Sequence, residues 1–147
     1  MNFEKSCGAV VFRDAECSGE KQRYVLMIKH SHNSNHSFPK GHVESGESEI
    51  ETAQREVFEE TAVQVRPETA DFRETVHYFP LPGVSKEVVY FLAKTTQKEI
   101  HPREGEIAEV EWVPIDKAEE SLSHENDKAV FRAAMKKYQE GEIFAST

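Results

Sequence analysis

The sequence predicts an α+β fold in which helices pack against a mixed β-sheet. Runs rich in β-branched and aromatic residues are separated by short turns that contain glycine and proline. Helical patterns interrupt these runs, but without the regular alternation of a βαβ protein. A chain of 147 residues that is 37% hydrophobic is large enough to bury one core. We therefore expect a single domain over residues 1–147.

The chain is expected to begin with a β-hairpin. Residues 6–13 and 22–30 have the composition of strands, and the polar stretch 14–21 connects them. A polar loop at 30–37 then leads into "FPKGHVESGE" at 38–47, in which a proline and two glycines mark turns.

A helix is predicted from Ser48 to about Ala62. Ser48 and Glu51 match a capping box, in which each side chain accepts a hydrogen bond from a free backbone N–H group. Apolar residues then follow at helical spacing, at Ile50, Ala53 and Val57.

Three more strands are expected in the second half of the chain. Residues 71–79 and 86–95 have strand composition and are joined by the turn-rich segment 80–85. In the third strand, at 107–114, apolar residues alternate with acids.

Two helices are expected after these strands. Asp116 and Glu119 resemble a second capping box and predict a short helix within 114–122. The last helix is predicted over 125–140, with Gly141 just beyond its end. Its inward-facing residues are expected to be Val130, Ala134 and Phe131.

The charge balance excludes several kinds of partner. Acids outnumber bases by 27 to 18, so the chain carries a net charge of −9 and is not expected to bind nucleic acid or an anionic membrane. No apolar run approaches the roughly 20 residues of a membrane span. Cys7 and Cys17 are too few for a disulfide framework or a zinc ribbon. These features favour a cytoplasmic protein, and both a monomer and a homodimer are compatible with them.

The predicted helix after Ser48 concentrates negative charge in the sequence "REVFEE" at 55–60. Glu56, Glu59 and Glu60 are three and four residues apart, so they lie on adjoining parts of one helix surface, where like charges repel. A solvated acidic face would explain a charge run. However, Glu56 and Glu60 border the apolar stripe of this helix. Carboxylate oxygens packed so closely suit Mg²⁺ or Mn²⁺, which would convert repulsion into shared coordination.

Residues 41–63, "GHVESGESEIETAQREVFEETAV", resemble the Nudix box. The residues that match its fixed positions are Gly41, Glu47, Arg55, Glu56, Val57, Glu59, Glu60 and Val63. Ala62 departs from the pattern, because it stands where the family usually has a glycine that permits a left-handed helix end. If Ala62 holds that conformation, the strain is roughly 1 kcal/mol.

The resemblance implies the Nudix α/β/α sandwich around a mixed β-sheet and a Mg²⁺- or Mn²⁺-dependent hydrolase. Such enzymes cleave nucleoside diphosphates linked to another moiety. By position, Glu56, Glu59 and Glu60 are implied as the catalytic and metal-binding residues, with one of them as the base for the attacking water. The Gly41 carbonyl is implied as a further metal ligand, and Glu47 and Arg55 as an ion pair that orients the helix.

Glu106 and three histidines are further metal candidates. Glu106 aligns with an acid that related enzymes supply to the metals from outside the box, although a solvated loop acid is an equal alternative. His30, His32 and His36 invite a zinc interpretation, but oxygen ligands dominate the better-defined site, so structural or solvated roles are favoured for these histidines.

Outside the box, "FPKGHVESGE", "KEVVYFLAK" and "EVEWVPIDKAEESL" are similar to the asymmetric diadenosine tetraphosphate hydrolases of this superfamily. Lys40 and Lys86 suit phosphate oxygens, with an ordinary surface lysine as an equal alternative for each. His42 is a further phosphate candidate. Tyr78 and Phe131 are candidates for stacking on adenine, with a core role as the alternative for each. A small-molecule nucleotide is therefore the expected ligand, and cleavage of diadenosine tetraphosphate into ATP and AMP is the expected reaction.

Other functions remain open from the sequence. A MutT-like pyrophosphohydrolase would act on oxidised nucleoside triphosphates, and related enzymes act on diphosphoinositol polyphosphates or nucleotide sugars. A non-catalytic nucleotide-sensing module of the same fold is the alternative from another class. Retention of Glu56, Glu59 and Glu60 argues against that alternative, because degenerate members usually lose box glutamates.

Overall fold

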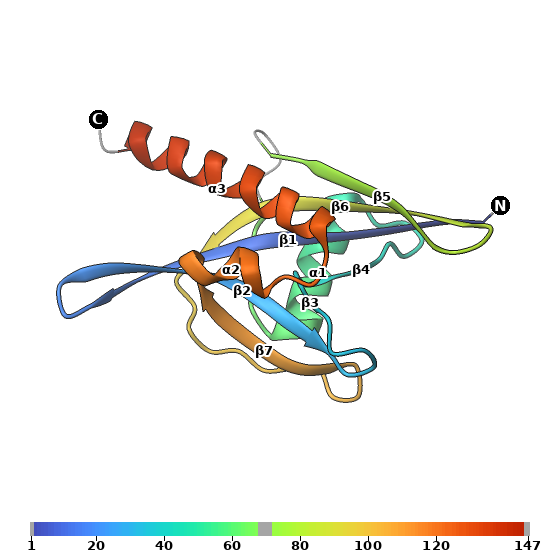
Figure 1. Cartoon of the computed structure of the whole chain (residues 1–147), viewed down its shortest axis with the longest axis horizontal. Helices are drawn as coiled ribbons and strands as arrows, with labels where there is room; N and C mark the ends of the chain where they lie inside the picture. The colour runs from blue at the N-terminus through green and yellow to red at the C-terminus, as the bar shows by residue number, and fades with distance from the viewer. Residues whose placement is uncertain (1, 68–71, 146–147) are drawn as a thin grey trace.

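The protein is a mixed β-sheet covered by helices on both faces (Figure 1). The computed structural model describes residues 2–67 and 72–145, without the side chains of Cys17 and 140–145. The strands are β1 (Asn2–Cys17), β2 (Glu20–His30), β3 (His36–Ser37), β4 (Lys40–His42), β5 (Glu74–Leu81), β6 (Val84–Thr95) and β7 (Ile107–Pro114). The helices are α1 (Glu49–Thr61), α2 (Ile115–Ser121) and α3 (Glu125–Ala145).

The sheet has the strand order β3-β2-β1-β6-β5, with β4 paired to β1 and β7 paired to β2. β1 and β6 run parallel, from the pair Asn2↔Val84 to the pair Arg13↔Thr95, and the other pairs are antiparallel. Helix α1 packs on β1 and β4 on one face, whereas α2 and α3 lie over the opposite face (Figure 1). The expected α/β/α sandwich around a mixed sheet is confirmed.

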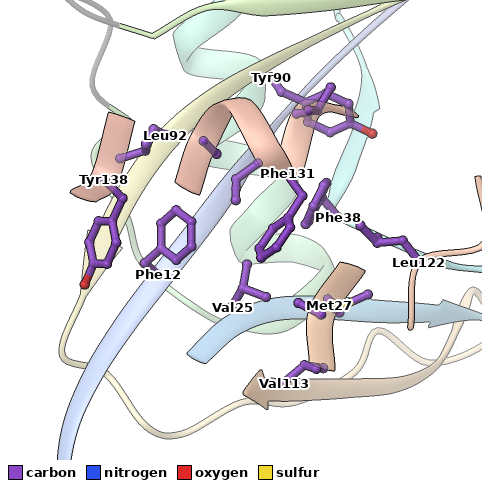
Figure 2. Close-up of a cluster of buried hydrophobic side chains, with 14 of the residues drawn as sticks. Phe12, Val25, Met27, Phe38, Tyr90, Leu92, Val113, Leu122, Phe131 and Tyr138 are labelled. Carbon is purple, nitrogen blue, oxygen red and sulfur yellow. The ribbon is translucent and has the colours of Figure 1, made fainter. Parts of the chain in front are cut away.

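Successive residues of β1 point into two different cores, because side chains alternate across a strand. Val10 and Phe12 join the core beneath α2 and α3, together with Tyr90 and Phe131 (Figure 2). Val11, like Ala9, packs instead on the α1 side. Both faces of the sheet are covered, which explains why β1 reads as a continuous apolar run rather than an alternating one.

The strands extend further than the sequence predicts. β1 begins at Asn2 rather than residue 6, because its first residues, which are exposed and mostly polar, are held by backbone pairing with β6 and need no buried side chains. β5 and β6 likewise extend into the predicted turn 80–85. Two short strands, β3 and β4, lie within stretches expected to be loops. Residue 71, where a strand was expected to begin, lies outside the described residues.

Two predicted helix boundaries are wrong. α2 begins at Ile115 after Pro114, and no side chain caps it, so Asp116 does not form the expected capping box. α3 continues through Gly141 to Ala145 rather than ending at that glycine. A single glycine inside a helix costs only about 1 kcal/mol relative to alanine, which is too little to end a helix by itself.

Helix α1, which carries the glutamates, begins as predicted. Ser48 Oγ accepts a hydrogen bond from the backbone N–H of Glu51, and the Glu51 side chain accepts one from the N–H of Ser48. At the other end, Ala62 has φ 66° and ψ 12°, the left-handed conformation. The helix therefore ends in the geometry for which the sequence pattern usually supplies glycine.

Candidate active site

The three glutamates lie where α1 meets the loop that contains β4. Glu56 and Glu60 are 8% and 6% exposed, whereas Glu59 projects from the same end of the helix into solvent. Val57, between them in sequence, is completely buried under the sheet. The apolar face of α1 thus holds two carboxylates at the edge of the core.

The β4 segment contacts these carboxylates through its backbone. The N–H of Lys40 donates a hydrogen bond of 3.0 Å to Glu60 Oε1. A Cβ atom placed on Gly41 would overlap the carboxylate of Glu56. Only glycine allows the chain to pass this close to the glutamate, and the close approach puts the Gly41 backbone beside the carboxylate cluster.

Arg55, within α1, forms an ion pair with Glu47, which precedes the helix. Arg55 Nε lies 2.6 Å from Glu47 Oε2, and Arg55 Nη2 donates to Glu47 Oε1 and to the carbonyl of His42, both at 2.9 Å. The hydrogen bond from Arg55 lowers the pKa of Glu47 to about 2. The Arg55 side chain therefore ties the loop at residues 42–47 to the helix. Arg55 Nη1 also donates a hydrogen bond of 2.6 Å to Glu56 Oε1.

Burial destabilises the charged forms of both inner glutamates. It raises the pKa of Glu60 to about 8, against the opposing effect of the Lys40 N–H. Burial also raises the pKa of Glu56, although the hydrogen bond from Arg55 opposes the shift. Nearby positive charge would offset this cost. A divalent cation fits this donor set, because the carboxylates and the adjacent Gly41 carbonyl are the oxygen ligands that Mg²⁺ and Mn²⁺ prefer.

The outer glutamate is engaged by two arginines. Glu59 Oε2 lies 3.2 Å from Arg55 Nη1 and 3.3 Å from Arg103 Nη1, and Arg103 Nη1 also lies 3.5 Å from Glu106 Oε2. Within residues 2–67 and 72–145, no three His, Cys, Asp or Glu side chains are arranged as a ready metal-binding group. Both arginines contact Glu59 Oε2, so a cation at that oxygen would compete with them.

A groove of about 480 Å³ runs along this cluster. Its lining combines the box residues with bases and acids from other segments. The lining includes Gly41, His42, Glu56 and Glu60, together with Lys40, Lys86, Arg103 and Glu106. The structure therefore brings Glu106, which is 46 residues from Glu60 in sequence, to the same groove as the box.

A second pocket, of about 450 Å³, adjoins the groove and shares His30, Lys40 and Lys86 with it. The Tyr78 ring lines this pocket, and Lys86 Nζ lies 6.0 Å from the ring centroid. Burial and the nearby Lys40 lower the pKa of Lys86. An anionic ligand near these two lysines would offset that repulsion.

The two remaining candidates, His42 and Phe131, lie at the rim of the groove and in the core. His42 is exposed, with Nε2 3.6 Å from Glu4 Oε2, at the rim of the groove. Phe131 is 4% exposed and packs against Phe12 and Phe38, so it lies in the core rather than on the pocket surface (Figure 2). The core alternative is the one that this packing favours, because a ring enclosed by other rings cannot stack on a ligand.

The three histidines considered for zinc form no metal-binding group with other His, Cys, Asp or Glu side chains in the part of the chain that the structure describes, although His30 and His32 both line the groove. His30 Nε2 lies 3.0 Å from Ser37 Oγ, and burial lowers the pKa of its imidazole. His36 belongs to β3 and is partly buried, and His32 is exposed in the preceding turn.

Two polar residues of this region were missed by the sequence analysis. Arg103 reaches the cluster from the loop before β7, and no local pattern signals a contact across 44 residues. Asp127, in the first turn of α3, is 5% exposed, lines the Tyr78 pocket and accepts a hydrogen bond of 3.3 Å from Tyr90 Oη. Acids are common in the first turn of a helix because they interact favourably with the helix dipole. The sequence position of Asp127 therefore does not indicate that it lines a pocket.

The structure defines an α/β/α sandwich with a carboxylate-lined groove, and comparison with known proteins gives the family. The profile of the NUDIX domain matches residues 5–134, so the chain belongs to the NUDIX family. Members of this family are hydrolases of nucleoside polyphosphates and related small nucleotides, and they generally use divalent metals such as Mg²⁺.

Individual relatives differ in the substrate that their names give. The chain is 31% identical over 138 residues to an 8-oxo-(d)GTP phosphatase of Mycolicibacterium smegmatis, an alignment that covers 90% of this chain and 42% of that protein. It is 29% identical to the asymmetrical bis(5'-nucleosyl)-tetraphosphatase of Sus scrofa, with 87% and 90% covered. This chain thus spans less than half of the mycobacterial relative but nearly matches the length of the porcine one.

Among solved structures, a C. elegans Ap4A hydrolase in a binary complex superposes with a TM-score of 0.78. The two chains are 25% identical, and the superposition covers 94% of this chain and 98% of that one. In the part of this chain that the structure describes, no helix is both long and apolar enough to cross a membrane.

Proposed function

We propose that this protein is a Mg²⁺-dependent hydrolase that cleaves diadenosine tetraphosphate into ATP and AMP. The observation that carries the proposal is the continuity of the glutamate groove with the Tyr78 pocket, through the shared Lys40 and Lys86. A polyphosphate chain needs cations along its length, and a nucleoside at its end needs an aromatic surface. The similarity in length and fold to asymmetric tetraphosphatases supports the same assignment.

Each group has a role in this proposal. Lys40 and Lys86 bind phosphate oxygens, and the Tyr78 ring stacks on one adenine, an interaction of about 1–3 kcal/mol. Glu56, Glu59 and Glu60 would hold the cation together with the Gly41 carbonyl, with Glu106 as a further ligand. A bound cation would neutralise charge on the phosphates and on the leaving group.

The reaction also needs a proton acceptor. Water adds to one phosphorus, a bridging P–O bond breaks, and the phosphates divide between ATP and AMP. The proton from water passes to one of the three carboxylates. The Glu47–Arg55 pair ties residues 42–47 to α1, and Glu56, Glu60 and Gly41 line the groove beside it.

A panel of substrates tests the proposed function. Dinucleoside polyphosphates with three, four and five phosphates are incubated with the protein and Mg²⁺, and products are resolved by ion-exchange chromatography. We expect ATP and AMP from diadenosine tetraphosphate, and no product when EDTA replaces Mg²⁺. Cleavage of none of these compounds would remove the assignment.

Hydrolysis of oxidised nucleoside triphosphates is a second candidate. The mycobacterial relative named as an 8-oxo-(d)GTP phosphatase supports it at 31% identity. Including 8-oxo-dGTP in the same panel separates the two candidates. A MutT-like enzyme would release a nucleoside monophosphate from 8-oxo-dGTP, and its kcat/KM for this substrate would exceed its kcat/KM for diadenosine tetraphosphate.

We further propose that residues 1–147 act as one domain on free nucleotides in the cytoplasm, without a nucleic-acid partner. The net charge of −9 supports this, because it disfavours approach to polyanions except where local cations reverse the field. Size-exclusion chromatography with light scattering distinguishes the monomer from the homodimer.

A further inference from the structure

Arg103 is anchored to the site by its backbone, while its side chain remains accessible. The N–H of His101 donates to the carbonyl of Thr61 at the end of α1, at 2.9 Å, and the N–H of Ile107 donates to the carbonyl of Arg103, at 3.0 Å. Two hydrogen bonds thus fix this loop against α1 and β7. The Arg103 side chain is 42% exposed at the groove.

The two arginines that contact Glu59 are held very differently. Arg55 has several partners at 2.6–2.9 Å, on Glu47, Glu56 and the carbonyl of His42, and its side chain is 22% exposed. Arg103 has only the longer contacts to Glu59 and Glu106, at 3.3 and 3.5 Å, among the residues that the structure describes. Exposed ion pairs of this kind contribute little to stability. Arg103 is therefore the cation that Glu59 exchanges most readily.

Arg103 contacts a part of the groove that the Tyr78 pocket does not share. Lys40 and Lys86 line both the groove and the pocket, whereas Arg103 lines the groove alone. A polyphosphate whose nucleoside occupies the Tyr78 pocket would pass the two lysines and the glutamates before it reaches Arg103. The guanidinium would then meet phosphates distal to that nucleoside, and its planar fork suits two phosphate oxygens at once.

We propose that Arg103 is a positioning residue that exchanges partners: it pairs with Glu59 and Glu106 without metal, and binds the distal phosphates of the substrate once a divalent cation takes those carboxylates. The residue would thereby give the enzyme a preference for long phosphate chains. This inference rests on the proposed function for the identity of the substrate, but the exchange with metal does not depend on it.

The metal exchange is tested in the absence of nucleotide. Binding of Mn²⁺ to the wild type, Arg103→Ala and Arg103→Lys is measured by electron paramagnetic resonance of the free ion. Arg132→Ala is the matched control, because Arg132 is an exposed arginine paired with a single acid, Glu119, away from the groove. We expect Arg103→Ala to bind Mn²⁺ about threefold more tightly, since a competing cation has been removed. Arg132→Ala should match the wild type.

The phosphate contact is tested by kinetics with the same variants. Loss of a charge-assisted contact should raise KM for the four-phosphate substrate about tenfold in Arg103→Ala, with a smaller increase for the three-phosphate substrate. Arg103→Lys should fall between the wild type and Arg103→Ala, because it keeps the charge and loses the fork. A thermal midpoint equal to that of the wild type verifies that each variant is folded.

Tighter metal binding together with weaker substrate binding is the signature of the exchange. A merely structural arginine would weaken both when removed. Unchanged or weaker Mn²⁺ binding in Arg103→Ala, or an unchanged KM, would overturn the inference. If the wild type cleaves no compound of the panel, the proposed function fails, whereas the Mn²⁺ measurement needs no turnover and still decides whether Arg103 competes with metal.

Discussion

Replacement of Ala62 by glycine should stabilise the protein. Ala62 holds φ 66°, and its backbone is fixed on both sides: its N–H donates to the carbonyl of Phe58 at 2.8 Å, and its carbonyl accepts from Gln97 Nε2 at 2.9 Å. The residue therefore cannot relax into a right-handed conformation without losing hydrogen bonds. The alanine Cβ keeps the strain that a glycine would remove.

The magnitude follows from two opposing effects. The left-handed conformation costs a residue with a Cβ about 1–2 kcal/mol. Glycine is more flexible in the unfolded chain, which costs about 0.4–1 kcal/mol of stability. The net gain for Ala62→Gly is therefore about 0–1.6 kcal/mol in the free energy of unfolding, with a midpoint of about 0.8 kcal/mol, or a rise of up to about 6 °C in Tm for a chain of this size.

Urea denaturation followed by circular dichroism measures this gain, with Ala129→Gly as the control. Ala129 is exposed within α3, where glycine should cost about 1 kcal/mol. Ala62→Gly should therefore shift the midpoint upward and Ala129→Gly should shift it downward. Equal destabilisation by both substitutions would refute the argument that Ala62 is strained.

Three further outcomes are expected. Glu60→Gln should reduce kcat about hundredfold or more, because a proposed ligand of the cation that neutralises the phosphates is lost, while Tm stays nearly unchanged; full activity in a stopped assay would show that its assigned role is wrong. Gly41→Ala should lower Mg²⁺ affinity by displacing the Glu56 carboxylate that its Cβ would overlap, which isothermal calorimetry detects as a raised Kd. The hydrogen bond from Arg73 lowers the pKa of Glu49 from 4.5 to about 2. The ionised Glu49 therefore stabilises the folded state fully above pH 4.5, and this contribution is lost as the pH falls towards 2. Tm of the wild type should thus fall more steeply over this range than Tm of Glu49→Gln, and parallel curves would contradict this.

Local signals explain what the sequence predicts well. The capping box at Ser48, the apolar spacing of α1 and the crowding of Glu56 and Glu60 all lie within a few helical turns. Each reports a short-range interaction that a neighbouring residue can reveal. The box pattern marks the position of Ala62 but leaves its conformation open, and the structure shows the left-handed one.

Contacts between distant segments explain what the sequence does not predict. The first residues of β1 are exposed and mostly polar, and pairing with β6 makes them a strand. Arg103 lies 44 residues from Glu59, and nothing in the sequence around it indicates that contact. Phe131 suits both a stacking role and a core role by composition. Its neighbours in space, Phe12 and Phe38, favour the second.

Titration of Mg²⁺ into the protein by isothermal calorimetry tests the account most directly, with the Glu56→Gln/Glu60→Gln double variant alongside. Two buried carboxylates on one helix, both with raised pKa values, are explained here by a cation that joins them when bound. We predict saturable uptake of Mg²⁺ by the wild type and its loss in the double variant. No uptake by the wild type, or equal uptake by both proteins, would contradict the account.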